Sequence, residues 1–327
     1  MLFQLQRLSS IAMLAVACSL ATALPARAAD YPTKPLRLII PFGPGGISDA
    51  LARLVAAKLS ERLGQPVVSE NKPGAATVVG IMATKNAAPD GYTLLLGGSS
   101  GPMNQALDKA VDYHVVNDFE PISIVAEFPF VMVVNPQLPA KNVSEFVAWL
   151  KSNPGKASYA IGGIGSSTHF AAEFFLSMTG TTAVAIPFSN APAVLQSVIT
   201  GDSQFGFDTP ASTKGQVAAG KLRALGVSTL QRTSAMPEVP TIAEGGVPGY
   251  NVTGFLSIVA PAKTPKDVVA RLNKELTAIM QDQALVDRLK GLGMEPTSST
   301  PEAATRRFAD ELARWSKLAQ ERKLQKQ

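Results

Sequence analysis

A glycine-rich loop between an apolar run and a helical pattern constrains this chain more than any other feature. The loop is Pro41-Phe42-Gly43-Pro44-Gly45-Gly46-Ile47-Ser48-Asp49. Residues 36–40 before it have the composition of a buried strand, and leucine and valine recur at helical spacing over residues 50–63. Ser48 and Asp49 fit the N-cap region of that helix. Such a loop leaves backbone N–H groups free at the positive end of the helix dipole, where anions bind.

The loop does not match the common phosphate and dinucleotide motifs. It contains no lysine, so it is not a P-loop, and its glycines lack the G-x-G-x-x-G spacing. Its three glycines let the backbone approach a ligand without obstruction by Cβ. On its own, the loop is equally compatible with a plain turn between a strand and a helix.

Length and composition favour an α/β protein of about two domains and exclude some functions. The chain has 327 residues, 46% hydrophobic and 17% charged, which suggests about two domains with ample core. Strand-like and helical runs alternate, which indicates an α/β fold. The formal net charge is +5, only 6% of residues are aromatic, and no basic stripe is interleaved with aromatics. We therefore expect no nucleic-acid partner.

The N-terminus has the pattern of a secretory signal peptide. Arg7 supplies a weak positive region, residues 11–24 are apolar, and Ala26-Arg27-Ala28 is an A-x-A cleavage site. We expect cleavage after Ala28, which leaves a periplasmic chain with a net charge of +3 and no cysteine. The alternative is a lipoprotein cleaved before Cys18, for which the preceding leucine lies one place too far upstream. The apolar run is too short for a membrane anchor.

The first third of the chain repeats strand, loop and helix three times. The third strand run, Tyr92-Thr93-Leu94-Leu95-Leu96, opens onto Gly97-Gly98-Ser99-Ser100-Gly101. Right-handed crossovers then predict a parallel sheet with helices on both faces. Two strand runs follow at 122–125 and 130–134 with no helix between them, as expected of a segment that crosses into a second domain.

The second half repeats the order of strand, glycine-rich loop and helix seen around the first loop. A strand run at 158–161 ends in Gly162-Gly163-Ile164-Gly165-Ser166-Ser167-Thr168, and a helix is predicted from His169. A strand run at 203–209 carries Asp208 near its end. The apolar run at 255–260 has the composition of a strand that crosses back to the first domain, before three C-terminal helices.

Ten short pieces of the chain, in their order and spacing, resemble the substrate-binding proteins of tripartite tricarboxylate transporters, also called the Bug family. The resemblance covers essentially the whole mature chain. The pieces are Tyr31-Pro32-Thr33-Lys34-Pro35, the first glycine loop with Asp49, Gly64-Gln65-Pro66-Val67-Val68, Asn71-Lys72-Pro73-Gly74, Ala88-Pro89-Asp90-Gly91-Tyr92-Thr93-Leu94, Asn153-Pro154-Gly155-Lys156, Gly220-Lys221-Leu222-Arg223-Ala224-Leu225, Pro237-Glu238-Val239-Pro240-Thr241, Ala260-Pro261-Ala262 and Arg271-Leu272-Asn273.

The resemblance implies a periplasmic-binding-protein-like (type II) α/β fold. Its two domains would each hold a mainly parallel sheet flanked by helices, joined by two crossing strands. We expect residues 1–28 to be the removed signal, residues 29–126 with 257–327 to form one domain, and residues 127–256 the other. The implied function is capture of a small carboxylate in the cleft and delivery by hinge closure to inner-membrane transporter subunits. The protein would act as a monomer, without cofactor or metal.

The resemblance also implies which residues bind the ligand. The carboxylate would lie between the two glycine loops, with contributions from three further segments. The predicted ligand-binding residues are Phe42, Gly43, Gly45, Gly46, Ser48, Asp49, Ser99, Ser100, Gly163, Gly165, Ser166, Ser167, Thr168, His169, Phe188, Asn190 and Asp208.

Two departures from the family pattern affect the expected ligand. Phe188-Ser189-Asn190 stands where the family often has tyrosine, lysine and glycine, so the lysine charge is lost. This favours a mono- or small dicarboxylate or an aromatic acid over a tricarboxylate. Gly43 stands where proline or alanine is common, which loosens the first loop. Asp208 has two open roles, as a cap of the strand end or as an acceptor for an amino or hydroxyl group of the ligand.

A serine hydrolase is the enzymatic alternative. Gly97-Gly98-Ser99-Ser100-Gly101 matches G-x-S-x-G after a strand, and Ser99 with Asp108 or Asp118 and His169 has the chain order of a triad. Against this, Pro102 would interrupt the helix expected after the nucleophile. With two histidines and no clustered carboxylates, a zinc site is not indicated. A ligand sensor without transport is a third possibility, and paired glycine loops argue against a purely structural exported protein.

Overall fold

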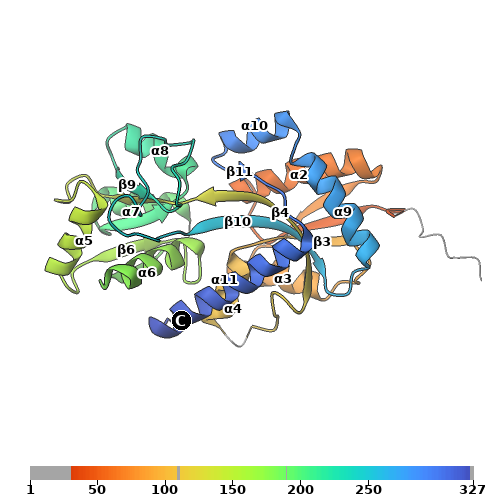
Figure 1. Ribbon diagram of the computed structural model, residues 1–327, viewed down its shortest axis with the longest axis horizontal. Helices are drawn as coiled ribbons and strands as arrows, with labels where there is room; N and C mark the ends of the chain where they lie inside the picture. The colour runs from red at the N-terminus through yellow and green to blue at the C-terminus, as the bar shows by residue number, and fades with distance from the viewer. Residues whose placement is uncertain (1–30, 109–110, 189, 325–327) are drawn as a thin grey trace, which may run out of the picture.

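The computed structural model describes residues 31–108, 111–188 and 190–324. The predicted signal peptide, its cleavage site and Cys18 lie outside these residues, as does Ser189. The described chain forms two sheets placed end to end, each with its own helices (Figure 1).

The first sheet has six strands in the order β11-β4-β10-β3-β1-β2. β1 pairs in parallel with β2 and β3, as the three strand–helix repeats predicted. β10 inserts antiparallel between β3 and β4, so a strand from late in the chain completes the centre of the sheet. The strands are β1 (Leu36–Ile40), β2 (Val67–Asn71), β3 (Thr93–Gly98), β4 (Phe119–Pro129), β10 (Thr253–Pro261) and β11 (Glu295–Pro296).

Helices cover both faces of the first sheet. The core on one face joins the strands to α2, α9 and α10, and the core on the other face joins them to α3 and α11. A short 3-10 turn, η1, precedes α3, and α4 packs along α11. The helices are α2 (Ile47–Leu63), η1 (Ala75–Thr77), α3 (Val78–Lys85), α4 (Ser100–Leu107), α9 (Lys266–Ile279), α10 (Gln283–Gly291) and α11 (Pro301–Glu321).

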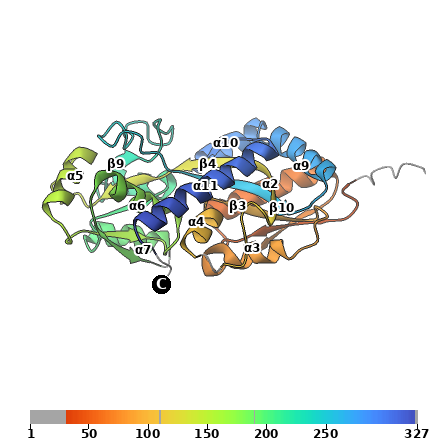
Figure 2. The same cartoon turned by 60° about the horizontal axis from the view of Figure 1, so that its bottom comes forward.

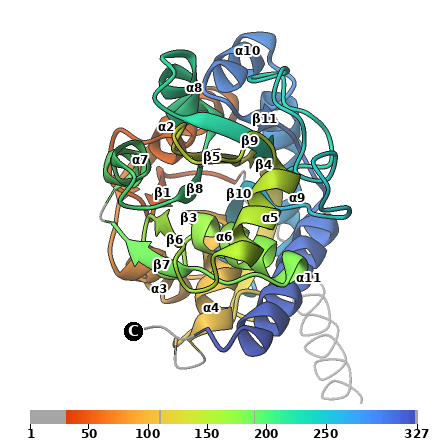
Figure 3. The same cartoon turned by 90° about the vertical axis from the view of Figure 1, so that its left-hand side faces the viewer.

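The second sheet has five strands in the order β7-β6-β8-β5-β9. β6 is parallel to β7 and β8, whereas β5 is antiparallel to β8 and β9. In Figure 3, α7 and α8 lie on one side of this sheet and α5 and α6 on the other. The elements are β5 (Val131–Val134), α5 (Val143–Ser152), β6 (Ser158–Ile161), α6 (Ser167–Thr179), β7 (Val184–Pro187), α7 (Ala191–Thr200), β8 (Phe205–Asp208), α8 (Pro210–Ala218) and β9 (Arg223–Val227).

Two strands carry the chain between the sheets. β4 passes into β5 at Phe130 without an intervening helix, and β10 brings the chain back beside β4. This confirms the predicted α/β architecture of two sheets flanked by helices. The expectation that each sheet is mainly parallel was wrong, because the strands that cross between the halves, β4 with β5 and β10, pair antiparallel with their neighbours. The exact domain limits, residues 29–126 with 257–327 and residues 127–256, remain our proposal.

The last helix crosses from one half of the molecule to the other (Figure 2). Phe308 of α11 belongs to a core of the first sheet, whereas Trp315 and Leu318 belong to a core of the second. Beyond the helix, Arg322 donates from Nε to Oε2 of the buried Glu173 in α6, at 2.7 Å. α11 is therefore a third link between the two halves, which the sequence analysis did not anticipate.

Candidate functional site

The first glycine loop is shaped by the carboxylate of Asp49. Asp49 is buried, and it accepts hydrogen bonds from the Gly45 N–H at 3.0 Å, Arg53 Nε at 3.1 Å and Asn71 Nδ2 at 2.8 Å. Burial alone would raise its pKa, but these three donors outweigh burial and hold it at about 2. The Asp49 carboxylate therefore binds protein donors and holds the loop in its conformation.

The loop presents its backbone rather than side chains. Residues 43–46 are exposed, and a Cβ added to Gly43 or Gly46 would meet no atom within 4 Å. Gly45 has φ of +86°, which favours glycine. α2 begins at Ile47 with Gly46 as its N-cap, so Ser48 and Asp49 lie in the first turn, slightly later than the capping position predicted. Free backbone N–H groups at the start of a helix are suited to an anion.

Phe42 flanks this loop at its start. Its side chain is half-buried against the core under α2, and its carbonyl accepts from Asn71 Nδ2 at 3.0 Å. Asn71 thus ties the start of the loop to its end through Phe42 and Asp49. The sequence analysis named Asn71 only within one of the pieces that carry the family resemblance and missed this role. The available signal was an asparagine at the end of β2, the strand that pairs with the strand before the loop.

The second glycine loop ends in a capped helix. Ser166 is the N-cap of α6 and accepts from the His169 N–H at 3.2 Å, while its hydroxyl lies 3.1 Å from that of Thr168. His169 is buried, and its Nδ1 accepts from the Gly165 N–H at 3.2 Å. Burial lowers the pKa of His169, which favours the neutral ring that this hydrogen bond requires. His169 and Ser166 therefore shape the loop, and Ser167 is the first residue of the helix.

The loop after β3 contributes one buried and one half-buried serine. The Ser99 hydroxyl accepts from the Phe255 N–H at 2.8 Å, so it is committed to the backbone of β10. Ser100 is half-buried, and its hydroxyl lies 3.4 Å from that of Thr77. Of the two predicted serines, Ser100 is the one with a hydroxyl available to a ligand.

A left-handed turn stands beside this serine loop, and sequence reasoning missed it. Ala75, Ala76 and Thr77 have φ of +45°, +52° and +84°, a region that residues other than glycine rarely occupy. Asn104 of α4 is buried and donates to the Ala76 carbonyl, which supports the turn. Backbone strain of this kind clusters at ligand sites. Propensity gives no signal for it, since alanine and threonine favour other conformations.

The two halves of the molecule come into contact at α4, whose Asn104 supports this turn. A Cβ on Gly165 of the second glycine loop would lie 2.9 Å from Oδ1 of Asn104 and 3.2 Å from Leu107. The structure therefore brings the second loop against α4 of the first half. Within residues 31–108, 111–188 and 190–324, no hydrogen bond joins the second loop directly to residues 42–49.

The remaining predicted residues lie at the ends of strands in the second sheet. Asp208 ends β8, is buried, and accepts from the Thr209 N–H at 2.7 Å. Burial raises its pKa to about 6, although hydrogen bonds from Thr209 and Ser212 oppose this shift. The Phe188 N–H donates to Ile161, and Asn190 caps α7 by accepting from the Ala193 N–H at 3.0 Å. Asp208 thus fulfils the capping role, and its contact with a ligand stays a prediction.

The geometry of a serine hydrolase is not present at Ser99. Its hydroxyl is bonded to Phe255, while Nδ1 of His169 accepts from Gly165. Pro102, however, does not interrupt the helix as the sequence analysis expected. Pro102 lies in the first turn of α4, where a missing N–H is tolerated, and the helix continues to Leu107. The hydrogen bonding of Ser99, rather than Pro102, is what separates this loop from a nucleophile elbow.

The described residues contain neither a cluster suited to a metal ion nor a helix suited to a membrane. Among the described residues, no three His, Cys, Asp or Glu side chains come together in a way that could hold a metal ion. In the same residues, no helix has both the length and the apolar character needed to span a bilayer.

Comparison with known proteins gives consistent matches. The family model described as tripartite tricarboxylate transporter family receptor matches residues 51–324. Protein BugT of Bordetella pertussis is 34% identical over 301 residues, which are 91% of this chain and 92% of that protein. Among solved structures, the periplasmic binding protein BugD has a TM-score of 0.77 at 31% identity, covering 91% of this chain and all of that one. An R. palustris protein with bound adipate has a TM-score of 0.78 at 32% identity, covering 89% and 97%.

Proposed function

Because this chain belongs to the receptor family of tripartite tricarboxylate transporters, we propose that it captures a small carboxylate between its two glycine loops and delivers it to a membrane transporter. The observation that carries the proposal is the exposed backbone of residues 43–46 at the start of α2, together with a second glycine loop at the start of α6 in the other half of the molecule. The adipate bound to the R. palustris relative supports a carboxylate ligand.

The donors at the two loops suit a carboxylate. Each loop offers N–H groups at the N-terminus of a helix, where the helix dipole favours negative charge. A charge-assisted hydrogen bond contributes about 1.5–3 kcal/mol. Two or three of them supply about 3–9 kcal/mol before the cost of association. The rest of the about −8 kcal/mol that corresponds to a micromolar dissociation constant must come from burial of the remainder of the ligand.

Delivery follows from the placement of the loops on different sheets. A ligand bonded to both loops favours the arrangement in which the two halves are closed around it. We infer that β4, β10 and α11 guide this closure and that membrane subunits of the transporter recognise the closed state. In this proposal the protein is a periplasmic monomer, exported by the predicted signal and cleaved after Ala28.

The proposal is tested by thermal unfolding of the refolded mature protein with a panel of small mono-, di- and tricarboxylic acids. A ligand at about a hundred times its dissociation constant stabilises by about 2.7 kcal/mol, which is readily measured. The informative variant is Gly46→Val, because the site of the new side chain is open and the backbone is extended, with φ of −81°. We expect the ligand-induced shift to disappear.

Gly291→Val is the matched control. Gly291 lies at the end of α10, and a Cβ there also meets nothing within 4 Å. This control is expected to keep the full ligand-induced shift. If no carboxylate stabilises the protein, or if Gly46→Val retains the wild-type shift, the proposed capture between the loops is wrong.

A further inference from the structure

A buried asparagine connects the left-handed turn η1 to α4. Asn104 is 2% exposed, so its amide needs partners within the protein. Its Nδ2 donates to the Ala76 carbonyl and to the Thr77 hydroxyl oxygen, the latter at 3.5 Å. The bond to a carbonyl fixes which side of the amide is nitrogen, because a carbonyl oxygen can only accept. Thr77 is thus the acceptor in its contact with Asn104.

A second contact continues from Thr77 to Ser100. The Thr77 hydroxyl accepts from Asn104 and donates to Ser100 Oγ, at 3.4 Å. Distances of 3.4 and 3.5 Å are long for hydrogen bonds, and polar contacts at functional sites commonly shorten when the ligand binds. In the part of the chain that the structure describes, the Ser100 hydroxyl makes no second hydrogen bond. Its proton is therefore left to donate to a further group.

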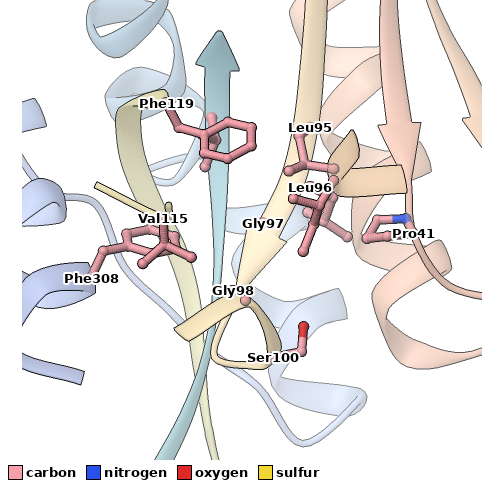
Figure 4. A pocket seen from close by; sticks show the side chains of 12 residues that line it. Pro41, Leu95, Leu96, Gly97, Gly98, Ser100, Val115, Phe119 and Phe308 are labelled. Atoms are coloured by element: carbon pink, nitrogen blue, oxygen red, sulfur yellow. The ribbon is translucent and has the colours of Figure 1, made fainter. Parts of the chain in front are cut away.

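Ser100 lies beside the first glycine loop. It comes directly after the end of β3 and Ser99, Pro41 comes directly after β1, and the two strands are neighbours in the sheet. Ser100 and Pro41 also line the same small cavity, together with Gly98 (Figure 4). The half-buried Ser100 hydroxyl is therefore close to the loop that we propose to hold the carboxylate.

The strained backbone of η1 is needed for this arrangement. Ala75, Ala76 and Thr77 all have left-handed φ angles, which are unfavourable for residues other than glycine. In this conformation the Ala76 carbonyl and the Thr77 hydroxyl meet the same amide. Backbone strain persists only where the surrounding structure holds it. The turn thus places the Thr77 hydroxyl between Asn104 and Ser100.

The other side of the Asn104 amide faces the second half of the molecule. Its Oδ1 lies 2.9 Å from the position of a Cβ on Gly165. The Gly165 N–H donates to His169, so it makes no competing bond to the amide. The orientation of Asn104 is therefore confined by the second glycine loop on one side and by η1 on the other.

We propose that Asn104 and Thr77 are positioning residues that orient the Ser100 hydroxyl as a donor to the ligand carboxylate. This inference rests on the proposed function, because it takes a carboxylate to lie at the first glycine loop. An ionised carboxylate can only accept hydrogen bonds, so a hydroxyl already held as a donor matches it without reorientation. Hydrogen bonds in series also polarise one another, which strengthens the last donor. No proton is transferred, and neither Asn104 nor Thr77 contacts the ligand.

Calorimetry on the refolded mature protein tests the proposal, with adipate, succinate and benzoate as the probe acids. For the acid that binds most tightly, Ser100→Ala is expected to weaken binding about tenfold or more, because a hydrogen bond to a charged group is lost. Thr77→Val has a similar shape without the hydroxyl and is expected to weaken binding about fivefold. Thr77→Ser keeps the hydroxyl and is expected to stay within about twofold of wild type.

A double-mutant cycle distinguishes orientation of Ser100 from a general structural effect. Thr77→Val is combined with Ser100→Ala, and the combination is expected to bind no more weakly than Ser100→Ala alone. Without the Ser100 hydroxyl there is nothing left for Thr77 to orient, so the two losses are not additive. A distortion of the site by valine would instead persist in the Ser100→Ala background.

Asn104 is tested with the strain of the turn removed. Asn104→Ala alone loses the support of η1, so it is combined with Ala76→Gly, which adopts the left-handed conformation freely. The pair is expected to recover the thermal stability lost in Asn104→Ala. It is still expected to bind the acid several-fold more weakly than Ala76→Gly alone, because Thr77 has no donor behind it.

Thr84→Val is the matched control. Thr84 is a fully buried threonine of α3 whose hydroxyl donates to the Gly80 carbonyl at 3.1 Å, away from Ser100. It is expected to keep wild-type affinity for the acid. Thermal unfolding without ligand shows how much stability each variant has lost.

The failures of the two proposals are distinguishable. If Thr77→Val binds as tightly as wild type, or if its loss persists undiminished in the Ser100→Ala background, Thr77 does not orient Ser100, and carboxylate capture by the glycine loops stands. If wild type binds none of the three acids, the proposed function fails and this inference fails with it.

Discussion

At the scale of single residues, two buried aspartates near the site have opposite electrostatic settings. Asp49 has three donors and a pKa held at about 2, whereas burial raises the pKa of Asp208 to about 6. The charged carboxylate of Asp49 thus stabilises the first loop, whereas ionisation of the buried Asp208 at the end of β8 is unfavourable. Each setting predicts a distinct dependence of stability on pH.

Asp49→Asn tests the lowered pKa of the Asp49 carboxyl. The folded-state pKa is lowered, so the charged carboxylate contributes stability above about pH 4, and this contribution is lost as the pH falls from about 4 to 2. We expect the wild type to be more stable than Asp49→Asn at pH 7 and this advantage to shrink towards pH 3. Urea unfolding of both proteins at several pH values measures it. Equal differences at pH 7 and pH 3 would contradict the assignment.

Asp208→Asn tests the raised pKa of the buried Asp208 carboxyl. The folded-state pKa is raised, so ionisation costs stability as the pH rises from about 4 to 6. A shift of about two units corresponds to about 2–3 kcal/mol. The variant, which retains an acceptor for the Thr209 N–H, is expected to gain a stability of this order at pH 7.5 and little at pH 4. A variant less stable than wild type at pH 7.5 would show that the charge of Asp208 is used.

At the scale of elements, the strands and glycine loops could be predicted from the sequence, whereas the hydrogen bonds that hold the loops in place could not. Apolar runs with turn residues between them predicted β1, β2, β3 and their parallel order, because these patterns depend on local periodicity. The glycine loops were predicted for the same reason. The bonds of Asn71 and Asn104 were not, since they join segments distant in the chain that no local pattern relates. Neither was the left-handed turn η1.

The strain in η1 gives an element-scale prediction. Ala76 is exposed with φ of +52° and ψ of +46°. A left-handed conformation costs a residue other than glycine about 1–2 kcal/mol, whereas glycine adopts it freely and loses about 0.5–1 kcal/mol through chain entropy. Ala76→Gly is therefore expected to stabilise the protein by up to about 1 kcal/mol in chemical unfolding.

Ala57→Gly is the matched control, because Ala57 is exposed within α2. There the same substitution should destabilise by about 1 kcal/mol. Opposite signs for the two changes would support strain in η1, and a loss of stability in both would refute it.

At the scale of the whole molecule, α11 couples the two halves. Trp315 packs against Phe170 with ring centroids 5.2 Å apart, and Arg322 pairs with Glu173, which also accepts from Tyr159. Removing one partner of a buried ion pair costs about 3–5 kcal/mol when both charges are buried, and less here because Arg322 is 21% exposed.

Arg322→Ala is thus expected to destabilise the second half by about 2 kcal/mol. The double variant Arg322→Ala with Glu173→Gln should recover part of this loss, since no buried charge is left unpaired. A double-mutant cycle in urea measures the coupling. Additive losses would show that the pair does not hold α11 to α6.

The insertion of β10 between β3 and β4 has a consequence for how the chain reaches its native state. Residues 131–227 supply all the strands of the second sheet, so that sheet is complete within one continuous stretch. The first sheet lacks a central strand until residue 261 has been synthesised, and pairings of such long sequence separation form slowly. During synthesis, β1, β2 and β3 can pair with one another, but the edge of β3 that β10 covers has no partner until β10 has been made.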